Sequence, residues 1–282
     1  MNQDTILFCH EGGSCSEQMV AVDNYTKLRV ISYSPAFQKG NIAIVFVGGL
    51  STVLESFGNI IYHLTSDFPF HYIETRDHSS SQILGEGHFD IETSGLDIAA
   101  VLCKLELKES EYVLMGYSLG VTVIADGFRH LKVKPKQMIF MEPTPVFHYP
   151  KWTIKLAKAT QGLKTMPLKI FAKWYIHNFI IDKNADAEMV LISAKAIDSC
   201  DPVKLKKTMV AIADYTLWDK LESIECPVLV IAATKDKFHV HDETLKMVSM
   251  LRNCSYIDLE TNQRSHSIEA AEVIKENLKK MP

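Results

Sequence analysis

The feature that most constrains the fold of this chain is a Gly-Tyr-Ser-Leu-Gly pentapeptide at residues 116–120. Residues 111–115, just before it, have the composition of a short β-strand, and residues 121–128, just after it, have apolar side chains at helical spacing. A strand that ends in Gly-x-Ser-x-Gly and leads into a helix is typical of a nucleophile elbow. We therefore expect Ser118 to sit on a tight, strained turn, with the first amides of the helix pointing at the space beside its hydroxyl.

The two glycines of the pentapeptide have a steric role in this interpretation. A Cβ atom at Gly116 or Gly120 would collide with the neighbouring strand or helix. Because Gly and Ser are common residues, the pentapeptide alone is a weak signal, and an ordinary strand-to-helix loop is the alternative. The flanking segments and the downstream residues described below favour the elbow.

Short apolar runs alternate with segments of helical periodicity along most of the chain. The expected strands are residues 18–22, 27–33, 42–47, 70–74, 111–115, 137–141, 228–232 and 255–259, and the expected helices are residues 54–64, 91–107, 121–128, 242–251 and 267–280. The first two strands form a predicted β-hairpin, and residues 42–47 are apolar at every position, as in a strand buried on both faces. This order predicts an α/β fold with a mainly parallel sheet, helices on both faces, and ligands at the carboxyl ends of the strands.

The alternation stops after about residue 145. Residues 146–221 have helical patterns and no convincing strand, and the buried-strand pattern returns at residues 228–232. We therefore predict one core made of residues 1–145 and 222–282, with an all-helical cap inserted at residues 146–221. A length of 282 residues is ordinary for one α/β domain that carries an insertion.

The composition excludes several classes of protein. A hydrophobic content of 47% and a charged content of 23% are typical of a globular protein, and a net charge of −4 gives no reason to expect nucleic acid as a partner. No apolar stretch approaches the roughly 20 residues of a membrane span, and the N-terminus lacks the basic start of a signal peptide. With six scattered cysteines, we expect a cytoplasmic protein with reduced thiols. Cys9, His10 and Cys15 are residue types that bind metals, but no second cluster completes a site.

A serine hydroxyl becomes a good nucleophile only when a base takes its proton and a third group orients that base. Asp236 follows the expected strand 228–232, and His266 follows the expected strand 255–259. Both loops belong to the same sheet edge as Ser118, in the order Ser, Asp, His that is described for this elbow. The sequence therefore predicts a catalytic triad of Ser118, Asp236 and His266.

Other residues near this edge were considered for the same roles. Glu142 follows the expected strand 137–141 and is the second choice for the acid. His239 and His241 also follow Asp236, but they precede the final strand, and we expect them to flank the next helix.

An oxyanion hole is the third requirement for acyl transfer. One amide is expected from Leu119, the residue after the nucleophile, and the other from Leu50, in the loop after strand 42–47. Gly48 and Gly49 allow the backbone of that loop to approach closely.

On these residues the chain resembles the α/β-hydrolase superfamily with a helical cap, over nearly its whole length. The matching segments are residues 47–50 for the apolar-His-Gly-x stretch, residues 76–81 for the Arg-Gly-x-Gly-x-Ser loop, Asp97 for a frequent helix position, and residues 219–231 for the return from cap to sheet. The departures are Gly48 in place of His, Ala233 in place of a Gly before the acid, Val121 in place of a second Gly after the elbow, and both glycines of the residue 76–81 loop. The resemblance implies a hydrolase whose nucleophile is Ser118, and a serine argues against the dehalogenase and epoxide-hydrolase branches.

Two functions remain open at this point. The first is hydrolysis of a carboxylic ester or thioester with an apolar acyl part, through an acyl-enzyme on Ser118 and with neither a metal nor an organic cofactor. The second is binding of a small molecule or partner by a hydrolase-fold protein whose chemistry is vestigial. The complete set of Ser118, Asp236 and His266 argues against it, and the altered Gly48 and residue 76–81 loops keep it open. The natural substrate, the acyl-chain length, the choice of ester or thioester and the oligomeric state are not predicted.

The expected cap is basic. Residues 143–181 contain no Asp or Glu, and their lysines are Lys151, Lys155, Lys158, Lys164, Lys169 and Lys173. On a helix, Lys151, Lys155 and Lys158 share one face, and Trp152, Leu156 and Ala159 share another, which we expect to close over the sheet with the lysines in solvent. The second interpretation is an apolar cavity under a basic rim that attracts an anionic headgroup, such as a CoA phosphate or an anionic lipid surface.

Overall fold

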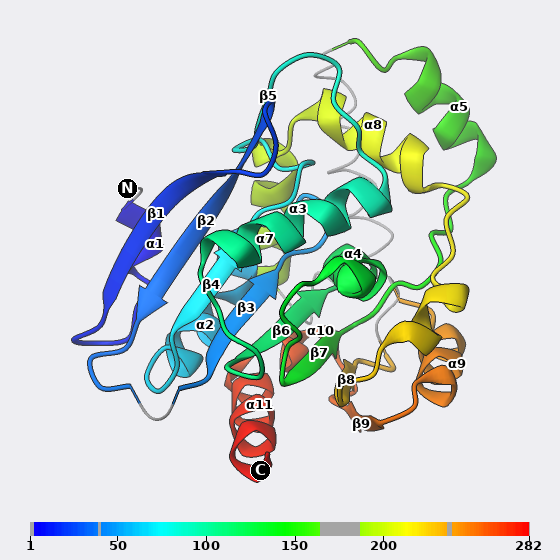
Figure 1. The fold of residues 1–282 in the computed structure, drawn as a ribbon. Helices are drawn as coiled ribbons and strands as arrows, with labels where there is room; N and C mark the ends of the chain where they lie inside the picture. Colours follow the sequence, from blue (N-terminus) through cyan, green and yellow to red (C-terminus); the bar gives the residue numbers. More distant parts are fainter. Residues whose placement is uncertain (1–2, 39–40, 164–186, 236–238, 282) are drawn as a thin grey trace.

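The computed structural model of this chain describes residues 3–38, 41–163, 187–235 and 239–281 (Figure 1). These residues form a nine-stranded sheet in the order β1-β2-β4-β3-β6-β7-β8-β9, with β5 beside β2. The strands are β1 (Ser14–Ala21), β2 (Thr26–Ser34), β3 (Ala43–Val47), β4 (Phe70–Ile73), β5 (Gln82–Ile83), β6 (Tyr112–Tyr117), β7 (Gln137–Met141), β8 (Val228–Ala232) and β9 (Cys254–Asp258). In this order, the neighbouring strands β4, β3, β6, β7, β8 and β9 are all parallel. Strand β2 pairs antiparallel with β1, β4 and β5. The prediction of a mainly parallel α/β sheet is confirmed.

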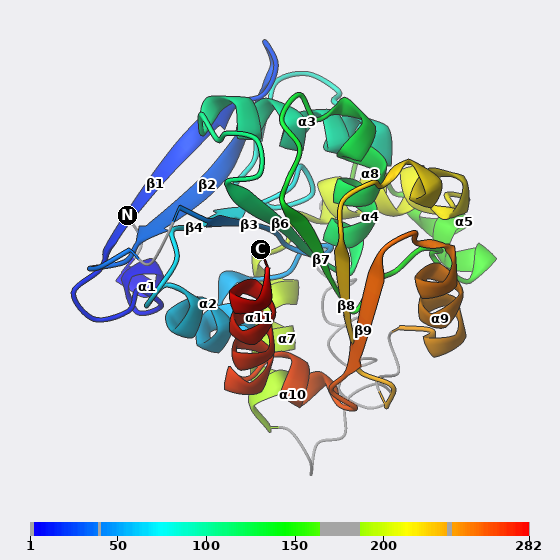
Figure 2. The same cartoon turned by 60° about the horizontal axis from the view of Figure 1, so that its bottom comes forward.

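Helices cover both faces of this sheet. The longer ones are α2 (Gly58–Leu64), α3 (Ile91–Lys104), α4 (Leu119–Gly127), α9 (His241–Met250) and α11 (Ile268–Lys280), and the short ones are α1 (Gln3–Ile6), η1 (Leu54–Phe57), η2 (Phe128–His130) and α10 (Asn262–Ser265). Figures 1 and 2 show α3 and α4 on one face and α2 and α11 on the other. The elements α1, α10 and β5 were not anticipated, because two to four residues carry too little periodicity.

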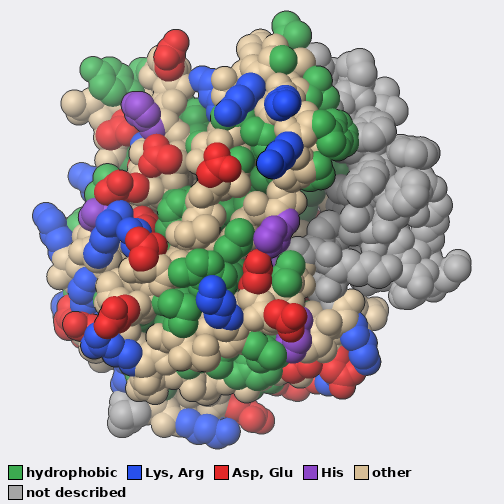
Figure 3. Space-filling view, turned by 90° about the vertical axis from the view of Figure 1, so that its right-hand side faces the viewer, with side chains coloured by type: hydrophobic (Ala, Val, Ile, Leu, Met, Phe, Trp, Pro, Cys, Tyr) green, Lys and Arg blue, Asp and Glu red, His purple; other side chains and the backbone are tan. Residues whose placement is uncertain are grey.

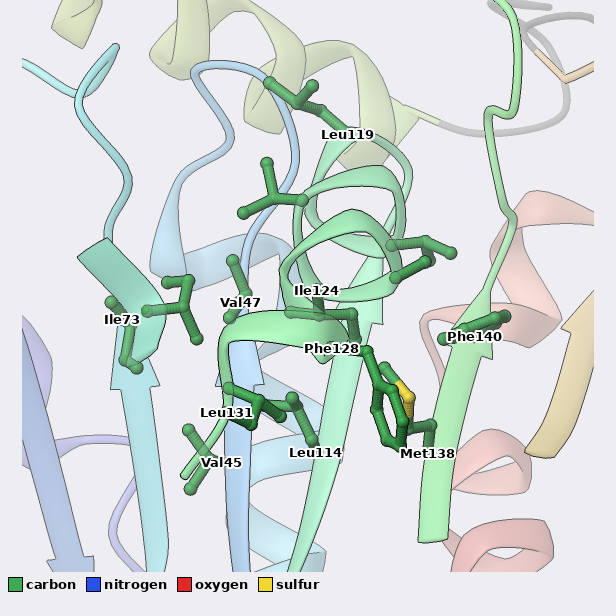
Figure 4. Packing of buried hydrophobic residues seen from close by; sticks show 14 of the residues in the cluster. Val45, Val47, Ile73, Leu114, Leu119, Ile124, Phe128, Leu131, Met138 and Phe140 are labelled. Carbon is green, nitrogen blue, oxygen red and sulfur yellow. The ribbon is translucent and has the colours of Figure 1, made fainter. Parts of the chain in front are cut away.

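The central strands are apolar at successive positions because each face contacts a different helical layer. In β3, Val45 and Val47 belong to the cluster beneath α3 and α4, whereas Ile44 and Phe46 belong to the cluster beneath α2 and α11. All four side chains are fully buried. Figure 4 shows the first of these clusters, in which Ile124 of α4 lies over the sheet near Val47 and Phe128. Burial of this kind stabilises the fold by roughly 25 cal/mol per Å² of apolar surface.

The segment between β7 and β8 contains α5 (Lys151–Ala159), α7 (Ala187–Ser199), α8 (Pro202–Ile212) and η4 (Trp218–Ser223). Its two ends lie together, because Val146 forms an antiparallel bridge with Thr216 and the amide of Leu217 donates to the Pro145 carbonyl at 2.9 Å. Helix α5 packs on α8, and both lie above the arrowheads of the central strands (Figure 1). A segment that leaves and re-enters the core at one point is what the expected insertion requires.

Helix α5 differs from the expectation in one respect. Trp152 and Leu156, which were expected to close over the sheet, are 59% and 44% exposed. The reason is that α5 meets α8 through the buried Ala157, so its other faces turn outward. The lysines of α5 are exposed, and Figure 3 shows Lys or Arg side chains gathered on this part of the surface. Lys164, Lys169 and Lys173 lie outside the described residues.

A membrane-spanning helix would have to be long and apolar, and no helix within the described residues meets both conditions.

Candidate active site

Ser118 lies on a sharp turn between β6 and α4. Its φ is +51° and its ψ is −115°, in the left-handed half of conformational space that residues with a Cβ rarely occupy. Its amide donates to the Met141 carbonyl at 3.0 Å, so the neighbouring strand β7 holds the strained residue in place. A strained serine between a strand and a helix is the geometry of a nucleophile elbow.

The glycines on either side have no room for a side chain. A Cβ on Gly120 would lie 2.2 Å from the Val47 carbonyl oxygen, and one on Gly116 would lie 2.7 Å from the Val121 nitrogen. Both obstacles are backbone atoms, which cannot swing aside as the end of a flexible side chain can. Close packing of β6, α4 and the loop after β3 therefore depends on glycine at both positions.

The hydroxyl of Ser118 contacts a histidine that is distant in sequence. Nε2 of His239 lies 3.1 Å from Ser118 Oγ, and the hydroxyl of Thr144 lies 3.1 Å from the same atom. The other ring nitrogen, Nδ1, lies 3.2 Å from Glu142 Oε2. Because a carboxylate only accepts, Nδ1 carries the proton in this arrangement, which leaves Nε2 able to accept the proton of Ser118.

Glu142 is a buried carboxylate in a polar cage. It is the residue after β7, its φ is +44°, and it is 1% exposed. Its oxygens accept hydrogen bonds from Tyr117 at 3.3 Å, from the Asn262 amide at 3.0 Å, and from the Ser265 hydroxyl. Burial alone would raise the pKa of Glu142, but the hydrogen bond and charge of His239, the charge of His266 and the hydrogen bond of Ser265 outweigh it and hold the pKa below its usual range. Glu142 therefore stays ionised and able to orient His239.

Of the two predicted partners of Ser118, Asp236 lies outside the described residues. His266 is described, and the structure places it elsewhere than expected. Within the described part of the chain, the hydrogen bonds of Ser118 Oγ go to His239 and Thr144. His266 is the C-cap residue that follows α10, and its Nδ1 lies 2.9 Å from the Asn262 carbonyl. Its ring stacks on Phe57 at a centroid distance of 5.3 Å, so local helix geometry and aromatic packing determine its orientation.

The sequence interpretation named His239 without giving it a role at Ser118, and it ranked Glu142 second for the acid. His239 was assigned to flank the next helix, and it does lie two residues before α9. The signal that could have ranked Glu142 higher was strand order, because β7 is the direct neighbour of β6 and Glu142 follows it. The contact between the hydroxyls of Thr144 and Ser118 had no signal in the sequence.

The loop after β3 approaches Ser118 closely. A Cβ on Gly49 would lie 3.3 Å from the Cβ of Ser118 and 3.0 Å from the ring of Tyr117, so the backbone itself passes beside the nucleophile. Leu50 follows in this loop, and Leu119 is the first residue of α4, where a helix leaves its amides without internal partners. The two predicted oxyanion donors thus lie on the two backbone segments that border Ser118.

The loop that follows β4 is anchored to the core by an ion pair. Arg76 donates to Asp97 of α3, at 2.8 Å for the Nη2–Oδ1 pair, and to Asp23 at 2.9 Å. Arg76 and Asp97 are 4% exposed each. Removing one partner of a buried pair leaves the other charge uncompensated, so this contact holds the loop firmly beside the site.

Among the described residues, no group of three or more His, Cys, Asp or Glu side chains is placed to hold a metal ion.

No family model matches this chain, and no curated protein does. Solved structures do match. A hydrolase from Pseudomonas aeruginosa has a TM-score of 0.76 at 16% identity, with 93% of this chain and 98% of that chain covered. A thermophilic esterase from Thermogutta terrifontis has a TM-score of 0.75 at 16% identity, covering 95% and 99%. The enol-lactonase from Burkholderia xenovorans has a TM-score of 0.74 at 17% identity, covering 93% and 98%.

These likenesses extend over nearly the whole of both chains in each comparison. They show that this chain has the α/β-hydrolase fold, as its resemblance to that superfamily implied. At 16–17% identity they carry the fold and not the activity.

Proposed function

We propose that this chain, which has the α/β-hydrolase fold, is a serine hydrolase that cleaves carboxylic esters or thioesters. The observation that carries the proposal is the line of contacts from Ser118 Oγ to His239 Nε2 and from His239 Nδ1 to Glu142. A hydroxyl, a base and a buried ionised acid in this order are the parts that nucleophilic acyl transfer needs. Two of the similar structures, an esterase and an enol-lactonase, support an ester as the class of substrate.

In the proposed reaction, Ser118 Oγ attacks the carbonyl carbon of the substrate while His239 Nε2 takes its proton. The tetrahedral intermediate collapses when the carbon–oxygen or carbon–sulfur bond breaks, and the protonated His239 gives its proton to the departing alkoxide or thiolate. Water then attacks the acyl-enzyme with His239 again as the base, which releases the carboxylic acid and restores the Ser118 hydroxyl.

Glu142 serves this cycle in two ways. Its hydrogen bond keeps the Nδ1 proton of His239 in place, so that Nε2 faces Ser118 in the form that accepts a proton. Its negative charge stabilises the imidazolium that forms during each proton transfer. The amides of Leu50 and Leu119 are proposed to bind the oxygen that becomes negative in the intermediate.

His266 and Asp236 remain the alternative base and acid, as the order of residues along the chain predicts. The ring of His266 lies 5.0 Å from that of Tyr117, which donates to Glu142, and the charge of His266 is one of the groups that lower the pKa of Glu142. Variants of the two histidines separate these assignments.

The lysines of α5 are proposed as a basic rim for an anionic part of the substrate. Lys151, Lys155 and Lys158 are exposed on one helix. If they attract a CoA phosphate, kcat/KM for an acyl-CoA will fall as salt rises from about 0.05 to 0.5 M, because salt shortens the Debye length several-fold. The kcat/KM for a neutral p-nitrophenyl ester is the control and should stay level, and equal behaviour of both substrates would contradict the rim.

The proposed function is tested by turnover of p-nitrophenyl esters of increasing chain length and of acyl-CoA thioesters. Wild-type protein and Ser118→Ala are compared, and thermal melting establishes that the variant is folded. We expect the variant to lose nearly all turnover. Hydrolysis by a folded Ser118→Ala protein at the wild-type rate would overturn the mechanism, and no turnover by either protein would favour a binding function.

A further inference from the structure

A buried carboxylate from another loop binds the backbone of the loop beside Ser118. Asp77 Oδ2 accepts a hydrogen bond from the Ser51 amide at 2.6 Å, and the Ser51 hydroxyl lies 3.4 Å from the same oxygen. Asp77 is 2% exposed. Ser51 has a φ of +50°, a conformation that a serine adopts only when its surroundings hold it.

Asp77 is itself fixed by its neighbours, and one of them makes a second contact to the same loop. The hydroxyl of Thr75 donates to Asp77 Oδ1 at 2.5 Å. His78 Nε2 lies 2.9 Å from the Thr52 carbonyl, and because a carbonyl only accepts, Nε2 is the donor. The loop that holds Asp77 thus supports residues 48–52, which we call the oxyanion loop, through an acceptor at Ser51 and a donor at Thr52.

Packing alone does not determine the conformation of the oxyanion loop. A cavity of about 190 Å³ lies beside it, and its lining includes Ser51, Thr52, Glu55, His78, Ser80 and Lys195. On this side the oxyanion loop borders a pocket and is not packed against protein atoms throughout. Hydrogen bonds orient its peptide groups. The Ser51 amide donates to Asp77, the Thr52 carbonyl accepts from His78, and within the loop the Thr52 amide and hydroxyl donate to the Gly49 carbonyl at 3.3 and 3.1 Å.

The supporting loop is also bound to α8. Lys204 Nζ donates to the His78 carbonyl at 2.9 Å, to the Ser81 carbonyl at 2.6 Å and to the Ser81 hydroxyl at 2.7 Å. Together with the ion pair of Arg76 and Asp97, these bonds make residues 75–81 a rigid support rather than a free loop.

We propose that Asp77 is a positioning residue for catalysis: by holding the Ser51 amide, it orients the Leu50 amide toward the oxygen that becomes negative when Ser118 attacks. Asp77 stands at the position of the first glycine in the Arg-Gly-x-Gly-x-Ser pattern, so this support is a feature of this chain's own sequence. The inference rests on the proposed function, because an oxyanion donor matters only if Ser118 attacks a carbonyl. It assigns Asp77 a role in the transition state and none in substrate binding.

The test compares kcat and KM for a p-nitrophenyl ester in wild-type protein, Asp77→Ala, Asp77→Asn and Ser80→Ala. Ser80 is the matched control, because it lies in the same supporting loop but its hydroxyl contacts Glu74 and not the oxyanion loop. A second readout is the affinity for an alkyl trifluoromethyl ketone, whose adduct on Ser118 places a negative oxygen in the oxyanion hole. Thermal melting identifies the folded variants.

We expect Asp77→Ala to lower kcat by about tenfold or more with KM within about twofold of wild type, since the loss of one whole oxyanion donor costs about 10²–10³-fold. Affinity for the ketone should fall by a factor similar to that for kcat. Asp77→Asn keeps the shape and one acceptor oxygen, so it should lose only a few-fold, and Ser80→Ala should equal wild type.

Three results would overturn the role of Asp77: a kcat for the folded Asp77→Ala within about twofold of wild type, a loss confined to KM, or an equal loss in Ser80→Ala. If Asp77→Ala does not fold, Asp77→Asn decides, and a wild-type kcat in that variant would contradict the proposal. These outcomes differ from failure of the proposed function, in which turnover by the wild-type protein would not depend on Ser118 at all.

Discussion

Nε2 of His239 lies 3.1 Å from Oγ of Ser118, although 121 positions separate the two residues in the sequence. The contact arises because β6 and β8 end at the same edge of the sheet with β7 between them. Glu142, which directly follows β7, contacts the other ring nitrogen of His239, Nδ1, at 3.2 Å. Three neighbouring strands thus bring Ser118, Glu142 and His239 together at one edge of the sheet.

The first prediction separates the two histidines near this point. We expect His239→Asn to lower kcat by about 10⁴-fold or more, because the asparagine amide replaces the donor at Nδ1 but leaves no base beside Ser118. The matched variant His266→Asn keeps a donor toward the Asn262 carbonyl and should lower kcat less than about tenfold. Ester hydrolysis by both variants, with melting curves, measures this. The reverse pattern would assign the base to His266.

The second prediction concerns Glu142. Its neighbours hold the pKa of Glu142 below its usual range, so we expect the acid limb of the kcat/KM profile to report protonation of the histidine that acts as base. Glu142→Gln removes a negative charge that favours the imidazolium. The acid limb should therefore move to lower pH, while kcat falls by about 10³–10⁴-fold. Profiles between about pH 4.5 and 9 test both effects. An unchanged limb and a near-wild-type kcat would exclude Glu142 as the acid and leave Asp236 as the candidate.

The third prediction concerns the packing of the elbow. Gly120→Ala should lower the free energy of unfolding by more than about 3 kcal/mol or prevent folding, because the new Cβ would meet the Val47 carbonyl at 2.2 Å. Gly162→Ala is the control, since nothing lies within 4 Å of a Cβ built there. Its effect should stay below about 1 kcal/mol in urea unfolding. Equal stability of the two variants would mean that the elbow is packed differently.

The fourth prediction is a pH dependence of stability that originates far from the site. Burial lowers the pKa of His71 in β4 to about 4, and its Nδ1 lies 2.8 Å from the Ser32 hydroxyl. In the unfolded chain the pKa returns to about 6.5, so the unfolded state binds the proton first as the pH falls below that value. The stability from neutral His71 is complete above about pH 6.5 and is lost progressively toward pH 4.

The measurement is the free energy of unfolding in urea at pH 7.5 and pH 5.0, for wild type and His71→Phe. We expect wild type to lose about 2 kcal/mol more than the variant between these pH values, since the other titrating groups are common to both proteins. If the two proteins lost the same amount, His71 would not be held neutral in the fold.

Much of the fold could be predicted from the sequence because its strands are buried on both faces. Strand β7 (Gln137–Met141) is buried at every position, so its apolar run marks where it begins and ends. Its observed bounds equal the expected ones. The elbow was predictable for a different reason, because its strand, turn and helix are contiguous in the sequence around Ser118. The antiparallel hairpin of β1 and β2 is likewise confirmed.

The partners of Ser118 were less predictable because they depend on the paths of loops between distant elements. Position after a strand placed Glu142, Asp236 and His266 at one edge, but it could not say which side chain turns toward Ser118. The four-residue helix α10 directs Nδ1 of His266 to the Asn262 carbonyl. So short a helix has no periodicity from which it could be predicted. The contact of Asp77 with Ser51 is equally invisible, since it joins two loops.

The most direct test of the account is the intact mass of the protein after exposure to a fluorophosphonate, for wild type, Ser118→Ala and His239→Asn. We predict a single adduct on wild-type protein, none on Ser118→Ala, and an adduct on His239→Asn that forms more slowly by several orders of magnitude. An adduct that persists in Ser118→Ala, or that forms at the wild-type rate in folded His239→Asn, would contradict the claim that His239 activates Ser118.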